Sequence, residues 1–436
     1  MGIVLENALI ADWSPIGVAS GALRIENGTI VERGEAVEAR SDDQVLDCRG
    51  ALVLPGLVNG HTHLYSALAV GMPPPAEPPK TFPEILERIW WRLDRAHDAE
   101  SIETAARIGA LDAIHCGVTT LIDHHASPSH IDGSLDLVER GLAAVGVRGV
   151  LCYETTDRNG PDGARAGLEE NRRYLTKRVD EPSGQFAGMV GAHASFTLEE
   201  ETLDALAQLA SEFDRGVHIH VAEDSCDENR CQEQFQTLLI DHLANHRLLS
   251  RPDSVFVHCT HLDAEALLRL LGAESFVAHC PRSNMNNATG TMPMVALRLP
   301  VVLGTDGHGS DMFFEARLAW LAARQEGTPL VPSQVLAALA RTQALAARLL
   351  DVKLGALQVG YAADVVVTDY RPATPLTPDN LADHVVFALG PQFVTDVMVG
   401  GRWVLRRRKA EQIDELAARR VGVEVARRLW ERMLRG

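Results

Sequence analysis

Two histidines placed two residues apart suggest the chemistry of this chain. The run LPGLVNGHTHLYSA at residues 54–67 leaves an apolar, strand-like stretch at Pro-Gly and then presents His61 and His63. Side chains at positions i and i+2 of an extended segment point to the same side, so both imidazoles can face one point in space. Two nitrogens can reach one metal ion in this way. A lone His-x-His pair also fits a hydrogen-bonded surface pair, so a metal site requires further ligands from elsewhere.

Further candidate ligands lie much later in the chain. Asp306 stands in a tight Gly-Thr-Asp-Gly turn, and the run HIHVAED offers His218 and His220 on one face of a predicted strand. We take His220, because it lies nearer the end of that strand. Nitrogen ligands with one carboxylate suit zinc, and iron or manganese nearly as well. The sequence therefore predicts a single divalent-metal site formed by His61, His63, His220 and Asp306.

Neighbouring side chains could complete a hydrolysis. A bound metal lowers the pKa of water, and attack on an sp² carbon then requires a group that moves protons. Glu223 follows His220 by three residues and is the natural proton shuttle, with Asp306 holding or deprotonating the water. His258 would polarise the electrophile or stabilise developing charge. The alternative for Glu223 is a surface carboxylate at a strand end.

The elements that must position these residues repeat along the middle of the chain. A short apolar run, a polar residue at its end and a helical stretch recur; 101–117 and 199–216 are typical amphipathic helices. Eight strands alternating with helices predict a (β/α)8 TIM barrel, whose catalytic groups gather at the carboxyl ends of its strands. The eight runs are 52–63, 118–125, 147–154, 186–195, 216–224, 254–261, 275–284 and 301–307. Their ends carry His61, His63, Asp123, His124, His125, Glu154, His193, His220, Glu223, His258, His261, His279, Asn284 and Asp306.

The two ends of the chain differ from its middle. Residues 1–54 and 355–409 show alternating β patterns with glycine turns, and neither end can form a core alone. We expect them to pair into a small β-sandwich beside a barrel that spans 55–354. Residues 410–436 form a basic amphipathic C-terminal helix in this prediction, for which packing on the protein is favoured over membrane binding.

The composition is that of an ordinary globular enzyme. The chain of 436 residues has 41 Lys and Arg against 59 Asp and Glu, a formal net charge of −18. This acidic balance argues against nucleic-acid and anionic-membrane partners. Seven scattered cysteines without a C-x-x-C pair indicate free thiols in a reducing compartment. Because neither a signal-peptide pattern nor a long apolar run is present, we expect a cytoplasmic protein.

Five motifs, taken in order, resemble those of the amidohydrolase superfamily. LPGLVNGHTHLYSAL, HIHVAED, HCTHLD, HCPRSNMNN and GTDGHGSD are similar to its deaminase and chlorohydrolase branch of ATZ/TRZ type, over nearly the full chain. The shorter runs WWRLDR, DHHAS, SNMNNA and GTDGHGSDM look like the aminohydrolases named SsnA, which are associated with selenium-dependent purine metabolism. The resemblance implies a metal-dependent hydrolase acting on a non-peptide carbon–nitrogen bond.

The resemblance also implies roles for individual residues. His61, His63, His220 and Asp306 would hold one catalytic divalent metal, Glu223 would carry the proton, and His258 would assist at the leaving or carbonyl group. In HCTHLD the alternative to His258 is His261. The residues expected to line the substrate pocket are His193, His279, Ser283 and Asn284. The helical segment 82–95 would be a lid, with Trp90 or Trp91 facing a planar substrate or packed in the core.

One absence bears on the number of metals. Binuclear members of this superfamily use a carboxylated lysine after strand four, and the run 186–197 contains no lysine. A mononuclear site is therefore favoured, and with it deamination of a ring carbon over opening of a cyclic amide. His124 and His125 keep a second metal in view.

Three functions follow as hypotheses. The first is an aminohydrolase that deaminates a purine-, pyrimidine- or triazine-like heterocycle. The second keeps the fold and metal but removes chloride or an alkylamine, or hydrolyses a cyclic amide. The third is a metal-bearing binding or maturation protein of selenium-linked purine metabolism. In each case we expect a small heterocyclic partner, no nucleic acid or membrane, and a homo-oligomer.

Overall fold

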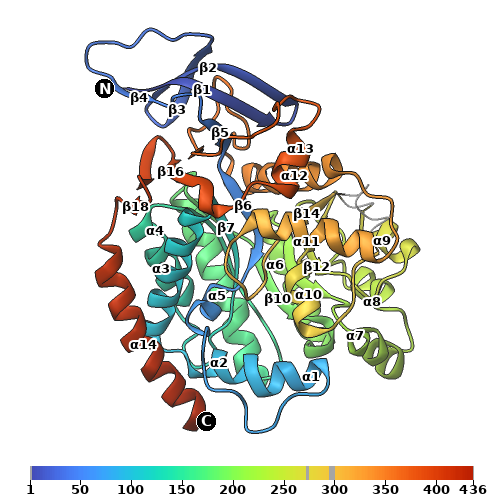
Figure 1. The fold of residues 1–436 in the computed structure, drawn as a ribbon. Coiled ribbons are helices and arrows are strands. Elements are labelled where there is room, and N and C mark those ends of the chain that lie inside the picture. The colour runs from blue at the N-terminus through green and yellow to red at the C-terminus, as the bar shows by residue number, and fades with distance from the viewer. Residues whose placement is uncertain (1, 272–273, 294–299, 436) are drawn as a thin grey trace.

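Two parallel sheets lie at the centre of the molecule, surrounded by helices (Figure 1). The computed structural model describes residues 2–271, 274–293 and 300–435. One sheet orders β6 (Leu57–Thr62), β7 (Val118–His125), β8 (Arg148–Tyr153) and β9 (Phe186–Gly188). The other orders β10 (Val190–Ala194), β11 (Val217–Val221), β12 (Val255–His258), β13 (Phe276–His279) and β14 (Val301–Leu303). All eight predicted runs therefore contain strands, in chain order.

Single bridges connect the edges of the two sheets. Thr62 in β6 pairs with Asp306 beyond β14, and Thr155 beyond β8 pairs with Ala192 in β10, both in parallel. Only Met189 separates β9 from β10, so these two strands together form the fourth predicted run. The hydrogen-bonded ladders stop at the bridges and do not close into one continuous barrel.

The side chains that point inward from these strands are apolar at one end of the strands and polar at the other. Val58, Val150 and Val302 belong to an apolar cluster that also contains Leu345 and Leu349 of α12 (Pro332–Leu350), which covers one end. Farther along the strands, histidines replace the aliphatic side chains. Every residue of β7 and β8 is buried, as is typical of parallel strands covered by helices. The apolar end thus supports a polar end at the carboxyl termini of the strands.

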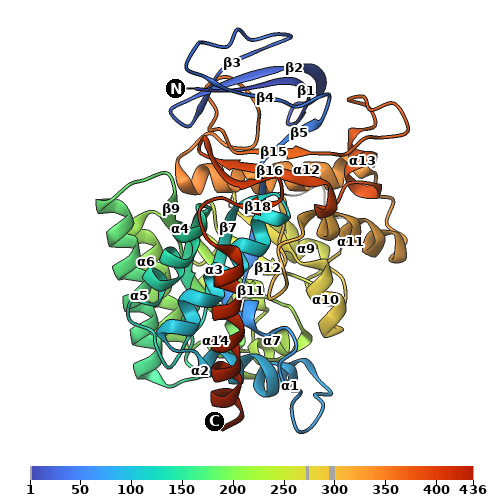
Figure 2. The ribbon, with the colours of Figure 1, turned by 60° about the vertical axis from the view of Figure 1, so that its left-hand side comes forward.

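Helices follow most of the strands and cover the sheets from outside (Figure 2). The predicted helices at 101–117 and 199–216 appear as α3 (Ala99–His115) and α6 (Glu200–Phe213). Asp98 caps α3 by accepting a hydrogen bond from the Ser101 amide. The others are α4 (Ser134–Val145), α5 (Pro161–Asp180), α7 (Ser225–Arg230), α8 (Leu239–Asn245), α9 (Ala264–Leu271), α10 (Pro281–Asn287), α11 (Met312–Gln325) and α13 (Leu381–Phe387).

The predicted lid segment is helical but irregular. It consists of α1 (Phe82–Ile85), a π-helical turn at Leu86–Trp90 and α2 (Trp91–Ala96). Thr81 caps its start, accepting from the Glu84 amide. The π turn changes the helical phase between its two ends, so Trp90 and Trp91 both reach the cavity described below.

The two ends of the chain share one nine-stranded sheet at the top of Figure 1. Its members are β1 (Ile3–Trp13), β2 (Ile16–Glu26), β3 (Thr29–Gly34), β4 (Gln44–Asp47), β5 (Leu52–Pro55), β15 (Val365–Thr368), β16 (Val394–Val399), β17 (Arg402–Arg406) and β18 (Lys409–Ala410). β5 pairs with β1 on one side and β15 on the other. It therefore joins the two halves in one ladder, where the sequence predicts a sandwich.

The predicted C-terminal helix is α14 (Glu415–Arg435), which packs along α2 and α3 on one side of the molecule (Figure 2). Its Trp430 donates a hydrogen bond to the Leu68 carbonyl, and its Arg432 donates to the Ala96 carbonyl. Among the described helices, none is both long enough and apolar enough to cross a membrane.

Candidate metal and active site

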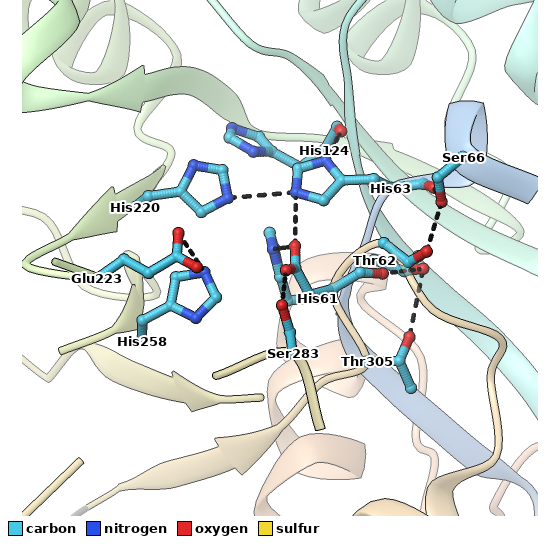
Figure 3. Close-up of polar contacts among 12 residues, drawn as sticks. His61, Thr62, His63, Ser66, His124, His220, Glu223, His258, Ser283 and Thr305 are labelled. Carbon is cyan, nitrogen blue, oxygen red and sulfur yellow. Dashed lines mark hydrogen bonds and ion pairs between the residues drawn. The ribbon is translucent and has the colours of Figure 1, made fainter. Parts of the chain in front are cut away.

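The four predicted ligands come together at the carboxyl ends of the strands, and Figure 3 shows three of them, His61, His63 and His220. Oδ1 of Asp306 lies 3.3 Å from Nε2 of His61 and 2.9 Å from Nε2 of His63. Nε2 of His63 in turn lies 3.2 Å from Nε2 of His220. The close approach requires Gly304, because a Cβ there would lie 2.8 Å from the Cβ of His61. Residues separated by more than 240 positions thus share one point.

The outer nitrogens of these rings are already engaged. Nδ1 of His63 donates to the His124 carbonyl at 2.6 Å, and Nδ1 of His220 donates to the His193 carbonyl at 2.8 Å. Nδ1 of His61 lies 2.8 Å from Nε2 of His218. The inner nitrogens of His63 and His220 therefore turn lone pairs toward each other and toward a carboxylate. Such a donor set fits a cation, and orientation of each ligand through its second nitrogen is typical of metal sites.

The proton affinities of the rings reflect this convergence. Burial lowers the pKa of His61 to about 3. Burial also acts against the charged form of His63, but its hydrogen bond to Asp306 and the charge of that carboxylate raise the pKa of His63 to about 9. Burial opposes ionisation of Asp306, yet the two rings hold its pKa well below the usual value. One positive charge beside the Asp306 carboxylate is thus favoured at this point.

Glu223 and His258 face each other beside the ligands (Figure 3). Oε2 of Glu223 lies 3.3 Å from Nε2 of His258. Burial and the negative charge of Asp306 raise the pKa of Glu223 well above its usual value, while burial lowers the pKa of His258 to about 4. A carboxyl group that holds a proton and a neutral imidazole are suited to move protons near neutral pH.

The backbone turns His258 toward the site. Strand alternation would place it on the outer face with Phe256, which packs in the outer core, whereas Val255 and Val257 face inward. The φ of His258 is +73°, in the left-handed region, and its ring lies 5.4 Å from that of His220. His261, the alternative to His258, is exposed, and its Nε2 lies 2.8 Å from the Thr289 carbonyl oxygen. The geometry therefore favours His258.

Ser283 and Asn284 of α10, predicted to line the substrate pocket, lie behind the site residues in the structure. Ser283 donates to Oδ2 of Asp306, and Nδ2 of Asn284 lies 3.0 Å from Nδ1 of His258. His279 is fully buried. Ser283, Asn284 and His279 are not among the residues that line the cavity. Asn287, one helical turn beyond Ser283, lines it instead and donates to Oε1 of Glu223 at 3.3 Å. Ser283 and Asn284 hold the carboxylate and the imidazole from behind.

A cavity with aromatic walls opens in front of the ligands. The predicted residues His193, Trp90 and Trp91 line it, and the ring of Trp91 lies 6.2 Å from that of His193. The sequence does not predict several other lining residues, whose positions depend on how short helical segments pack: Tyr65, Phe82, Leu86, Phe196, Asp227 and Asn287. Of these, only Asn287 carried a signal, through its four-residue spacing from Ser283. Aromatic walls that face imidazoles and carboxylates suit a planar ligand with polar groups on its edge.

His124 and His125, the pair that kept a second metal in view, lie in different surroundings. His124 is buried against the ligand group, with its ring 4.9 Å from that of His220 and neither nitrogen hydrogen-bonded within the described residues. Together with His61, His63 and His220 it could also hold an ion. His125 points elsewhere and contacts Ser127 at 3.0 Å. The pair therefore does not form a second site of its own.

A comparison with known protein families shows which family this chain belongs to. The model of the amidohydrolase family matches residues 52–404. The chain belongs to the amidohydrolase family. As a member, it is a hydrolase of carbon–nitrogen bonds other than peptide bonds, and the resemblance noted in the sequence is confirmed.

Known proteins resemble this amidohydrolase over almost its whole length. A 5-methylthioadenosine/S-adenosylhomocysteine deaminase of Syntrophomonas wolfei is 28% identical over 441 residues, which cover 98% of this chain and 99% of that one. A 5′-deoxyadenosine deaminase of Methanosarcina acetivorans is 28% identical over 425 residues, 95% of each chain. The crystal structure of an adenosine deaminase from Xanthomonas campestris with bound zinc has a TM-score of 0.84 at 21% identity, over 98% of both chains. It shows that the fold is shared.

Proposed function

We propose that this amidohydrolase removes the amino group from the purine ring of an adenosine-like nucleoside and releases ammonia. The observation that carries the proposal is the close approach of His61, His63, His220 and Asp306, the last three of which line one cavity together with Glu223. The two curated relatives, named for deamination of 5′-modified adenosines, support this substrate class. The narrower likeness to SsnA remains a prediction from the sequence.

We propose one divalent ion per chain, zinc, held by these four residues. The close approach of Nε2 of His63, Nε2 of His220 and the carboxylate of Asp306 supports binding of a dication. When bound, such an ion supplies Lewis-acid activation of water near neutral pH. Iron or manganese would suit the same donors.

The side chains of the chain then have distinct tasks. Glu223, which holds a proton at rest, gives it to the ring nitrogen of the base; its carboxylate then takes a proton at Oε2 from the attacking water and delivers it to the departing amino nitrogen. With Nδ2 of Asn284 donating to its Nδ1, His258 carries its hydrogen on Nε2, where it can donate to developing negative charge. Asp306, fixed by Ser283, orients the water as an acceptor.

Substrate binding uses the aromatic wall of the cavity. Trp91 is held in place by Arg158, whose guanidinium lies 5.0 Å from the ring centre and pairs with buried Asp94. We propose that Trp90 or Trp91 stacks on the planar base and that His193 donates to or accepts from its edge. His193 is oriented for this by the Thr197 hydroxyl, 2.7 Å from its Nδ1.

We propose that residues 55–354 act as a (β/α)8 barrel whose hydrogen-bonded ladder is interrupted at the two bridging pairs, and that the shared sheet of residues 1–54 and 355–409 folds into the accompanying β-sandwich. Residues 410–436 carry the terminal helix. We also propose that the protein assembles as a homo-oligomer, which sedimentation or light scattering tests directly.

An activity screen after metal analysis tests the function. The protein with one zinc per chain is incubated with adenosine, 5′-methylthioadenosine, S-adenosylhomocysteine, guanine, cytosine and an aminotriazine, and ammonia is measured. Release from an adenosine-like member supports the proposal. Chloride or alkylamine release from substituted triazines without ammonia would favour the dechlorinating alternative. Tight binding of these heterocycles without any turnover would favour the binding-protein alternative.

A further inference from the structure

A second group of metal-type ligands lies outside the active site, between α6 and α8. His242 and His246 are four residues apart on α8 and its C-cap, so they share one face of that helix. Glu200 and Asp204 have the same spacing in the first turns of α6. One ligand atom each of Glu200, His242 and His246 lies within 4.8 Å of the others. None of these residues contributes to the cavity above.

His246 is oriented as a ligand would be. Its Nδ1 lies 2.8 Å from Oδ1 of Asp204, and its Nε2 lies 3.8 Å from Oε1 of Glu200. The Asp204 carboxylate accepts the Nδ1 hydrogen and so leaves the Nε2 lone pair turned toward Glu200. This arrangement of carboxylate, imidazole and open lone pair is the one that orients histidines at metal sites.

His242 supplies an independent observation. The residue is only 3% exposed, and its Nε2 has no hydrogen-bond partner among the described residues. Phe235 stacks on the ring with 4.3 Å between centroids, and the ring of His246 lies 4.8 Å away edge-on. A buried imidazole nitrogen without a partner is unfavourable unless something occupies its lone pair. The packing by Phe235 fixes the ring in this position.

We propose that Glu200, His242 and His246 form a second binding site for a transition-metal dication such as Zn²⁺, with Asp204 as the positioning residue of His246. Two imidazoles and one carboxylate suit zinc, and water can take the fourth position. The ion would tie α8 to α6 across about forty residues of chain. The site is separate from the active centre, so its test does not depend on the proposed function.

Zinc titration of the metal-loaded protein tests this site. Protein that already holds its first ion is titrated with Zn²⁺ against a chromophoric chelator, and uptake per chain is measured. We expect one further ion and a rise in the thermal midpoint. Glu200→Gln, an exposed and nearly isosteric change, and His246→Ala should each abolish the second uptake. Asp204→Asn should weaken it by about 10–100-fold, because the orientation of His246 is lost.

His115→Ala is the matched control. His115 pairs with Glu415 at 2.9 Å on the surface, like His246 with its carboxylates, but it belongs to none of the candidate ligand groups of the described residues. This variant should take up the second ion as the parent does. Co²⁺ in place of Zn²⁺ should give visible bands that disappear in Glu200→Gln. No uptake by the parent beyond its first ion, or unchanged second uptake by both Glu200→Gln and His246→Ala, would overturn the proposal.

Discussion

Nε2 of His63 lies 3.2 Å from Nε2 of His220, while the other nitrogen of each ring donates to a backbone carbonyl. Neither ring can turn a hydrogen toward the other without giving up its outer hydrogen bond or taking on a charge. In the metal-free protein a proton on His63 relieves this opposition, as the pKa of about 9 indicates. A metal ion would replace that proton, so metal binding and protonation compete.

This competition predicts a pH-dependent metal affinity. Below about pH 9 the proton on His63 must leave before an ion binds, so zinc affinity should rise about tenfold per pH unit and flatten above pH 9. Calorimetric titration of the metal-free protein in buffers of different ionisation enthalpy measures the protons released. We expect close to one from His63 near pH 7.5. Affinity that does not change between pH 6.5 and 8.5 would contradict this account.

Glu223 should be required for turnover and dispensable for metal binding. Its carboxylate faces His258 and Asn287 and is not part of the ligand group, so Glu223→Gln removes proton transfer while keeping the shape of the site. We expect turnover to fall by about 10²–10⁴-fold at unchanged metal content. Glu233→Gln, on the exposed surface after α7, serves as the control and should match the parent in both measurements. Activity of Glu223→Gln equal to the parent would refute the proposed mechanism.

The strands and their histidines could be predicted because they follow local rules. His61 and His63 share a face through the two-residue period of β6, and His218 and His220 do so in β11. Both histidines of β11 have polar partners, His220 at the site and His218 behind His61. These relationships depend on spacing within one strand, which the sequence displays directly.

What could not be predicted depends on contacts between distant segments. The run 52–63 divides at Gly56 into strands of two different sheets, at a point where the chain passes so close to Thr119 that a Cβ would collide with it. The left-handed backbone of His258 overrides strand alternation. The phase of α10, which turns Asn287 and not Asn284 into the cavity, follows from how that helix is packed. No local pattern in the sequence encodes the first two features, and the third has only the four-residue spacing of Ser283 and Asn287.

A buried ion pair connects the parallel sheets to the terminal sheet and should contribute strongly to the free energy of unfolding. Nε and Nη2 of Arg148, at the start of β8, each lie 2.9 Å from an oxygen of Asp364, next to β15, and both residues are buried. Arg148→Ala leaves the Asp364 carboxylate buried without its partner, which should lower the free energy of unfolding by about 3–5 kcal/mol. Urea denaturation measures the change. Arg419→Ala removes the exposed pair with Asp112 and should lower it by less than about 1 kcal/mol.

The terminal helix should stabilise the segment that follows the metal ligands. Trp430 of α14 donates from Nε1 to the Leu68 carbonyl at 2.9 Å, at the end of the short 3-10 helix Leu64–Leu68 that begins directly after His63. Trp430→Phe keeps most of the ring packing and removes the donor, so we expect a loss of about 1 kcal/mol in the free energy of unfolding. Because Tyr65 in this segment lines the cavity, KM should rise more than kcat falls. Trp320→Phe, whose ring packs on Phe387 away from the cavity, is the control, and an equal change in KM for both variants would show that the effect is not local.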